Sequence, residues 1–165
     1  MTKDQRPMIR LMALIAALVL GTSAAAQTNV ALGGLTVDTT AAIEVTADSL
    51  NVDQDTATAV FSGGVVIGQG DLRLTAGEVT VVYGDDTTEI AKLIATGGVT
   101  FVTSTEAAEA QDADYDIVTG LLTLTGDVLL TQGASALTSD LMRVNLEDGT
   151  AQMDGRVKTI LRGAD

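Results

Sequence analysis

The chain has 165 residues, with 22 Asp and Glu against nine Lys and Arg, and a formal net charge of −13 at pH 7. This charge argues against binding to nucleic acid, because phosphate contacts depend on lysine and arginine. The absence of cysteine and histidine excludes disulfides, Ser-His-Asp and Cys-His catalysis, and the usual zinc, copper and iron sites. We expect a protein that is not an enzyme and that uses no cofactor and no metal.

The first 26 residues have the organisation of a secretory signal peptide. Three basic residues among the first ten precede an apolar run over residues 11–20, and Ala24 and Ala26 form an A-x-A cleavage site. An uncleaved membrane anchor is the alternative, but a spanning helix needs about 20 apolar residues. We predict cleavage after Ala26, a flexible segment over 27–42 and one folded domain over 43–163.

From Ile43 onwards the sequence is rich in Val, Thr, Ile and Leu and is punctuated by Gly and Asp. This composition is typical of β-structure, and only the run EAAEAQDAD at 106–114 leaves a helix open. The sequence therefore predicts an all-β domain.

A glycine-marked strand recurs four times at intervals of about 30 residues, which indicates an internal repeat. Every second residue around the first glycine of each motif is mostly apolar, so each strand has one apolar face. A shorter strand and a turn precede each motif, which predicts four hairpins, and the first glycine permits a bend or bulge. The four motifs begin at Gly63, Gly97, Gly126 and Gly155.

Hairpins that share one apolar face cannot remain a single open sheet in water, so we expect a sandwich, an open barrel or a jelly roll. The apolar face is either a sealed core or the lining of a groove. The predicted lining comprises Phe61, Val65, Ile67, Val99, Phe101, Ile117, Leu124, Val128, Leu130 and Met153.

Residues 43–160 resemble the LptA/OstA-like family. The shared pattern is a small residue and Asp before an alternating strand, then F-x-G-x-V-x-[IV]-x-Q-G, and then L-x-A-[DG]-x-[VLA]-x-V. The resemblance implies an antiparallel β-jellyroll built of repeated hairpins and open along one side. Its interior would hold the acyl chains of lipopolysaccharide in the periplasm. The matching residues are Ala47 and Asp48, then Phe61, Gly63, Val65, Ile67, Gln69 and Gly70, then Leu74, Ala76, Val79 and Val81.

The resemblance also implies partners: an LptC-type protein of the inner membrane, an LptD-type protein of the outer membrane, and further copies of the chain joined head to tail. Arg156, Lys158 and Arg162 are candidates for contacts with a lipid phosphate or with a partner. The alternative for these three is a solvated edge strand guarded by charge. For the protein, the alternatives are a secreted structural or adhesive β-repeat protein with a closed core, or an LptC-like anchored partner.

Other functional motifs are incomplete. The run Gly68-Gln69-Gly70 lacks the third glycine and the following helix of a nucleotide-binding loop. The acidic groups lie in turns or at strand starts, where we expect them to cap backbone amides rather than to catalyse hydrolysis or bind calcium. These groups are Asp53 with Asp55, Asp85 with Asp86, and Asp112 with Asp114 and Asp116.

Overall fold

The computed structural model describes residues 28–31, 38, 40–84 and 89–160. Within these residues the chain forms thirteen strands and no helix, which confirms the predicted all-β class. The run at 106–114 forms two strands on either side of Gln111. The strands are β1 (Thr28–Ala31), β2 (Ile43–Thr46), β3 (Ser49–Asp53), β4 (Thr58–Gln69), β5 (Leu72–Tyr83), β6 (Ile90–Thr96), β7 (Val99–Val102), β8 (Glu106–Ala110), β9 (Asp112–Asp116), β10 (Leu121–Gln132), β11 (Ser135–Asn145), β12 (Thr150–Asp154) and β13 (Lys158–Ile160).

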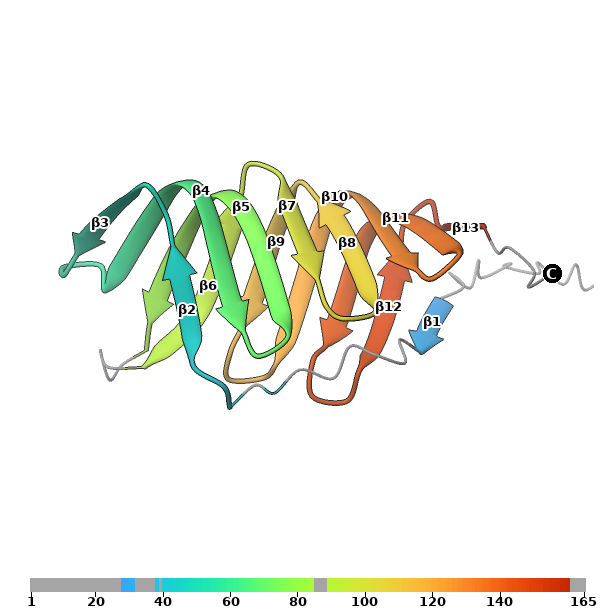
Figure 1. Ribbon diagram of the computed structural model, residues 1–165, viewed down its shortest axis with the longest axis horizontal. Coiled ribbons are helices and arrows are strands. Elements are labelled where there is room, and N and C mark those ends of the chain that lie inside the picture. The colour runs from blue at the N-terminus through green and yellow to red at the C-terminus, as the bar shows by residue number, and fades with distance from the viewer. Residues whose placement is uncertain (1–27, 32–37, 39, 85–88, 161–165) are drawn as a thin grey trace, which may run out of the picture.

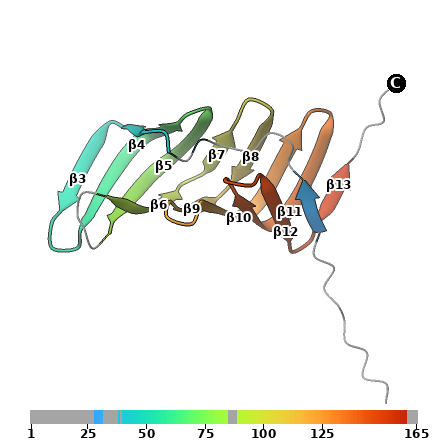
Figure 2. The same ribbon diagram turned by 90° about the horizontal axis from the view of Figure 1, so that it is seen from below.

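The strands form one antiparallel sheet that is folded into two layers (Figures 1 and 2). Four long strands, β4, β5, β10 and β11, pass from one layer to the other. In β4, for example, residues 58–62 pair with β3, whereas residues 66–69 pair with β2. We call the layer with β2, β7, β8 and β13 the front layer, and the layer with β1, β3, β6, β9 and β12 the back layer.

The four predicted hairpins are confirmed, and they build most of the back layer. They join β3 to β4, β5 to β6, β9 to β10, and β11 to β12. The long strands then continue beyond the hairpins into the front layer, where tight turns join β4 to β5 and β10 to β11. Each repeat therefore contributes to both layers.

The predicted bend is confirmed at the first glycine of all four motifs, and we call this line of bends the corner. Gly63, Gly97, Gly126 and Gly155 have φ of +83°, +82°, +83° and +77°, a region that glycine adopts readily. The amide of Asp48 donates to the Gly63 carbonyl at 3.0 Å. A Cβ at Gly63 would lie 2.6 Å from an Asp48 carboxylate oxygen, so a larger residue would have to displace the Asp48 side chain.

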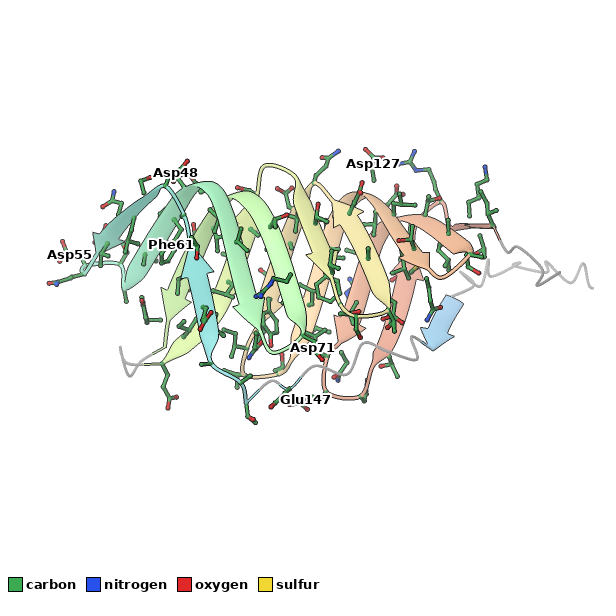
Figure 3. The ribbon with its side chains drawn as sticks, in the orientation of Figure 1. Asp48, Asp55, Phe61, Asp71, Asp127 and Glu147 are labelled. Atoms are coloured by element: carbon green, nitrogen blue, oxygen red, sulfur yellow. The ribbon has the colours of Figure 1, made fainter. Side chains whose placement is uncertain are left out.

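The hydrophobic core lies between the layers as one contiguous cluster that extends from β4 to β12. The corner joins the layers along the edge marked by Asp48 and Asp127 in Figure 3. Along the opposite edge, marked by Asp71 and Glu147, the two layers end in separate turns. The sheet is therefore open along one side and does not close as a barrel.

Candidate functional site: the interior between the layers

The structure brings all ten predicted lining residues to the interior. Eight of them are between 0 and 2% exposed, and Phe61 and Ile117 are half-buried and pack against the same cluster. The eight buried residues are Val65, Ile67, Val99, Phe101, Leu124, Val128, Leu130 and Met153.

The partner strands supply a matching set of apolar side chains that the predicted lining omitted. These follow the same alternation, so a period-2 search of β5, β6, β10 and β11 finds them. Together with the predicted lining they leave the two layers in contact, so an apolar guest enters only by separating them. They include Leu74, Val79, Val81, Leu93, Leu122, Leu137, Met142 and Val144.

A polar rim borders this interior where the front layer meets the open side, and the sequence analysis did not predict it. It consists of Gln69, Thr103, Glu106 and Gln132, which lie in the interior-facing register. Glu106 is 4% exposed, and its carboxylate accepts hydrogen bonds from Thr103 Oγ1 at 2.9 Å and Gln132 Nε2 at 3.0 Å. Partnered polar groups can thus be buried here at small cost.

On the back layer, Tyr115 faces this rim. Its hydroxyl donates to Gln69 Oε1 at 3.1 Å, and both side chains are buried. Burial and then the charge of Glu147 raise the pKa of Tyr115 above its ordinary value of 10.0, so the hydroxyl stays protonated at neutral pH. Beside this pair lies a hollow of about 500 Å³, lined by Thr40, Ala41, Ile43, Gln69, Glu89, Ile90 and Ile117.

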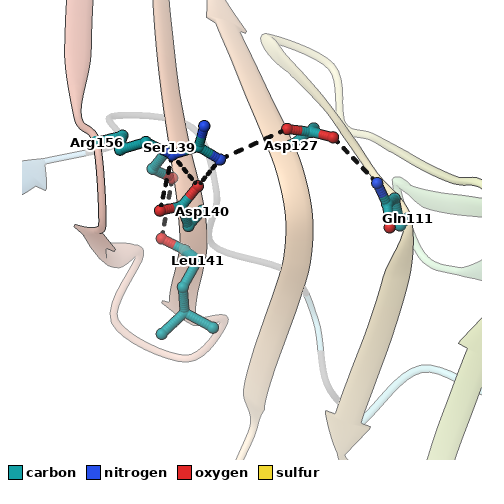
Figure 4. Close-up of polar contacts among 6 residues, drawn as sticks. All are labelled: Gln111, Asp127, Ser139, Asp140, Leu141 and Arg156. Carbon is teal, nitrogen blue, oxygen red and sulfur yellow. Dashed lines mark hydrogen bonds and ion pairs between the residues drawn. The ribbon is translucent and has the colours of Figure 1, made fainter.

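The candidate basic residues lie away from the open side. Arg156 is at the corner, where its guanidinium contacts Asp140 at 2.5 Å and Asp127 at 3.9 Å, and Gln111 Nε2 also donates to Asp127 at 3.0 Å (Figure 4). Lys158 is exposed on β13. Arg162 lies outside the described residues. The roles of these three in contacting phosphate or a partner stay predictions.

Three of the acidic candidates, Asp53, Asp114 and Asp116, have structural partners. Asp53 Oδ1 accepts from the amide of Asp55 at 2.9 Å, and Asp116 Oδ1 accepts from the Thr119 amide at 2.9 Å, as expected of turn caps. Asp114 pairs with Lys92 at 3.1 Å. The described part of the chain holds no cluster of three or more acidic residues placed to bind a metal ion.

Some of the predicted features lie outside the described residues. These are the signal peptide at the N-terminus and, in the segment between β5 and β6, Asp85 and Asp86. Over the residues that the structure does describe, no helix has the length and apolar character to cross a membrane. The strand β1 lies within the segment 27–42, and the mobility predicted for that segment stays a prediction.

Comparisons with known proteins agree with this architecture. The chain is 25% identical over 154 residues to a protein of Rhizobium meliloti (strain 1021) described as "Uncharacterized protein R00383", covering 87% of this chain and 83% of the other. The fold matches the crystal structure of LptH from Pseudomonas aeruginosa, described as the LptA homologous periplasmic component of the lipopolysaccharide transport device. That match has a TM-score of 0.70 at 16% identity and covers 77% of this chain and 99% of LptH.

The sequence also matches a family model. Residues 44–150, well over half of the chain, fit the model described as "LptA/(LptD N-terminal domain) LPS transport protein". These residues include the corner glycines Gly63, Gly97 and Gly126 and nearly all of the interior. The chain therefore belongs to the LptA/LptD N-terminal domain family of lipopolysaccharide transport proteins.

Proposed function

We propose that this protein is a periplasmic component of lipopolysaccharide export that holds the acyl chains of lipopolysaccharide between its two layers. The observation that carries the proposal is the apolar interior, which extends without a break from β4 to β12 between layers joined along one edge only. Membership of a lipopolysaccharide transport family supports the identity of the guest.

The energetics favour such a guest. An acyl chain of a dozen carbons gains roughly 10 kcal/mol on leaving water, at about 0.8 kcal/mol per methylene. Separating the layers breaks contacts such as those of Phe101 and Leu124, which are 1% and 0% exposed. An inserted acyl chain replaces these contacts with similar apolar ones, so the interior stays out of water while the lipid is bound.

The strand edges support an end-to-end arrangement. The sheet ends in β2 and β3 at one end and in β1 and β13 at the other. Unpaired strand edges are templates for β-augmentation by another chain. We infer that these edges join copies of the chain head to tail, and join the resulting bridge to an LptC-type partner at the inner membrane and an LptD-type partner at the outer membrane.

The proposal includes export and a purely binding role. We infer that the first 26 residues are removed after Ala26, which leaves Gln27 as the N-terminal residue of a periplasmic protein. N-terminal sequencing of the exported protein tests this, and an intact N-terminus would favour an anchored, LptC-like role.

With neither histidine nor cysteine in the chain, we infer that the protein has no enzymatic activity and that partners drive the transport.

Site-specific photocrosslinking tests the central claim. A photoreactive phenylalanine analogue at Phe101 or Leu124, both interior, should crosslink to lipopolysaccharide in living cells. The matched controls are Thr100 and Thr125, which are the next residues on the same strands and belong to the outward-facing register. Crosslinking that is no stronger from the interior positions than from the outward ones would show that the interior is a sealed core.

A further inference from the structure

A hydrogen bond links the two layers at the open side, far from the corner that joins them covalently. It runs from Tyr115 Oη in β9 of the back layer to Gln69 Oε1 at the end of β4 in the front layer, over 3.1 Å. Gln69 Nε2 in turn donates to the carbonyl oxygen of Ala41 at 3.2 Å. The side-chain amide of Gln69 thus links the front layer to the back layer and to the segment that precedes β2.

The position of this contact matters, because layers hinged at one edge separate most at the opposite edge. Gln69 is 2% and Tyr115 is 4% exposed, so solvent does not reach the bond while the layers are closed. The hollow of about 500 Å³ beside it is lined in part by Ile43, Ile90 and Ile117. That volume lies in the range of pockets that take small ligands.

We propose that Gln69 and Tyr115 form a clasp that holds the interior closed at the open side, and that an acyl chain passes this point when the clasp opens. The inference rests on the proposed function for the identity of the guest. When the clasp opens, the hydroxyl and the amide both meet water, so neither group loses its hydrogen bonding as the layers part. The pair therefore holds the layers together only by the small net strength of one hydrogen bond, which permits repeated opening.

The first test measures opening without any lipid. The chain contains no cysteine and two tyrosines, so Ala108→Cys introduces a single thiol at an interior position that is 1% exposed. In that background Tyr115→Phe should speed the reaction of the thiol with a small maleimide by roughly two- to tenfold, the effect of one lost hydrogen bond. Tyr83→Phe is the matched control, because the Tyr83 hydroxyl has no hydrogen bond within the described residues. Equal rates in the two variants would overturn the clasp.

The second test measures uptake of fluorescently labelled lipopolysaccharide by stopped flow. Tyr115→Phe should take up the lipid faster than wild type and Tyr83→Phe, by a factor similar to that seen with the thiol. A purely structural role would lower the unfolding midpoint of Tyr115→Phe and leave its uptake rate unchanged, which would overturn the gating role.

A tethered variant closes the test. With Gln69→Cys and Tyr115→Cys joined by a short bis-maleimide, uptake should fall at least tenfold relative to the untethered double variant. Unchanged uptake by the tethered protein would show that lipid enters elsewhere and would overturn the proposal. If wild type and all variants fail to bind lipopolysaccharide while thiol labelling still depends on Tyr115, the proposed function fails and the clasp between the layers stands.

Discussion

The two ends of the molecule are built from the same repeat but differ in their edge strands and in the exposure of their apolar side chains. At the end formed by β2 and β3, Leu50 and Val52 are 54% and 57% exposed, although they pair with Phe61 and Ala59 and so share the interior-facing register. Near the opposite end, which is formed by β1 and β13, Met153 on β12 is 0% exposed. We call the first end uncovered, because its edge strand exposes apolar interior-facing side chains, and the other end covered, because the strand β1 flanks β12 there (Figure 2).

The two ends also differ by one strand that is distant in sequence. β1 pairs with β12 in the register that sets Thr28 opposite Met153, and thereby extends the back layer by one strand at this end. No further strand of the described chain pairs with the free edge of β3. The comparison teaches that the described chain adds a strand outside the repeat, β1, at one end and leaves the edge of β3 unpaired at the other.

The largest expected effect comes from shortening one apolar side chain near each end of the molecule. Met153→Ala should lower the free energy of unfolding by about 2–5 kcal/mol, the usual cost of a cavity in a packed core. Leu50→Ala should cost less than about 1 kcal/mol, because over half of its side chain already meets water. Urea unfolding of the exported form measures both changes. Equal losses would contradict the structural difference between the ends.

The corner is the feature that the two ends share, so its disruption should cost the same at both. Gly63→Ala and Gly155→Ala should each destabilise the protein by about 1–3 kcal/mol, because alanine resists positive φ and its Cβ would lie 2.6 and 2.5 Å from the carboxylates of Asp48 and Asp140.

Gly64→Ala is the control for the corner prediction. Gly64 has φ of +54°, but a Cβ there meets no atom within 4 Å, so only backbone strain applies and about 1 kcal/mol is expected. If Gly63→Ala proves no more costly than Gly64→Ala, the close contact at the corner does not constrain the fold.

The corner and the hairpins could be predicted because their signals are local. Glycine at a fixed register and Asp in the turns act within a few residues, and the family pattern repeats them. The clasp had no such signal: Gln69 belongs to the family pattern, but Tyr115 is 46 residues away and no local pattern pairs the two. The strand β1 and its pairing with β12 were missed for the same reason, since the two strands lie near opposite ends of the described sequence.

The uncovered end should control association between copies of the chain. Leu50→Glu should weaken self-association about tenfold or more, because a partner strand seated on β3 would bury an unpaired charge. Sedimentation velocity over a concentration series measures this. Val118→Glu is the matched control, since Val118 is 79% exposed in the turn between β9 and β10, away from both ends. A similar loss of association in both variants would point to net charge rather than to the β3 edge.

The smallest expected effect concerns the corner next to the covered end. Hydrogen bonds from Arg156, followed by its charge, hold the pKa of Asp140 below the ordinary 3.8, whereas at the uncovered end the equivalent of Arg156 is Gly64. Because the pKa of Asp140 is lower in the folded than in the unfolded protein, its ionised form stabilises the fold at pH values above the unfolded-state pKa. This stabilisation is lost as the pH falls through the folded-state pKa. Arg156→Gln should therefore move the Asp140 titration midpoint up towards 3.8 and flatten the loss of stability on acidification.

Carboxyl NMR titration of Asp140 measures that change directly. Arg143→Gln is the control, because Arg143 pairs instead with Asp154 at 3.0 Å and its removal should leave the Asp140 midpoint in place. Both groups of the Arg156 pair are largely solvated, so screening by salt should weaken the shift. If the midpoint is the same with and without Arg156, the two ends of the corner are electrostatically alike, and the difference between the ends rests on β1 alone.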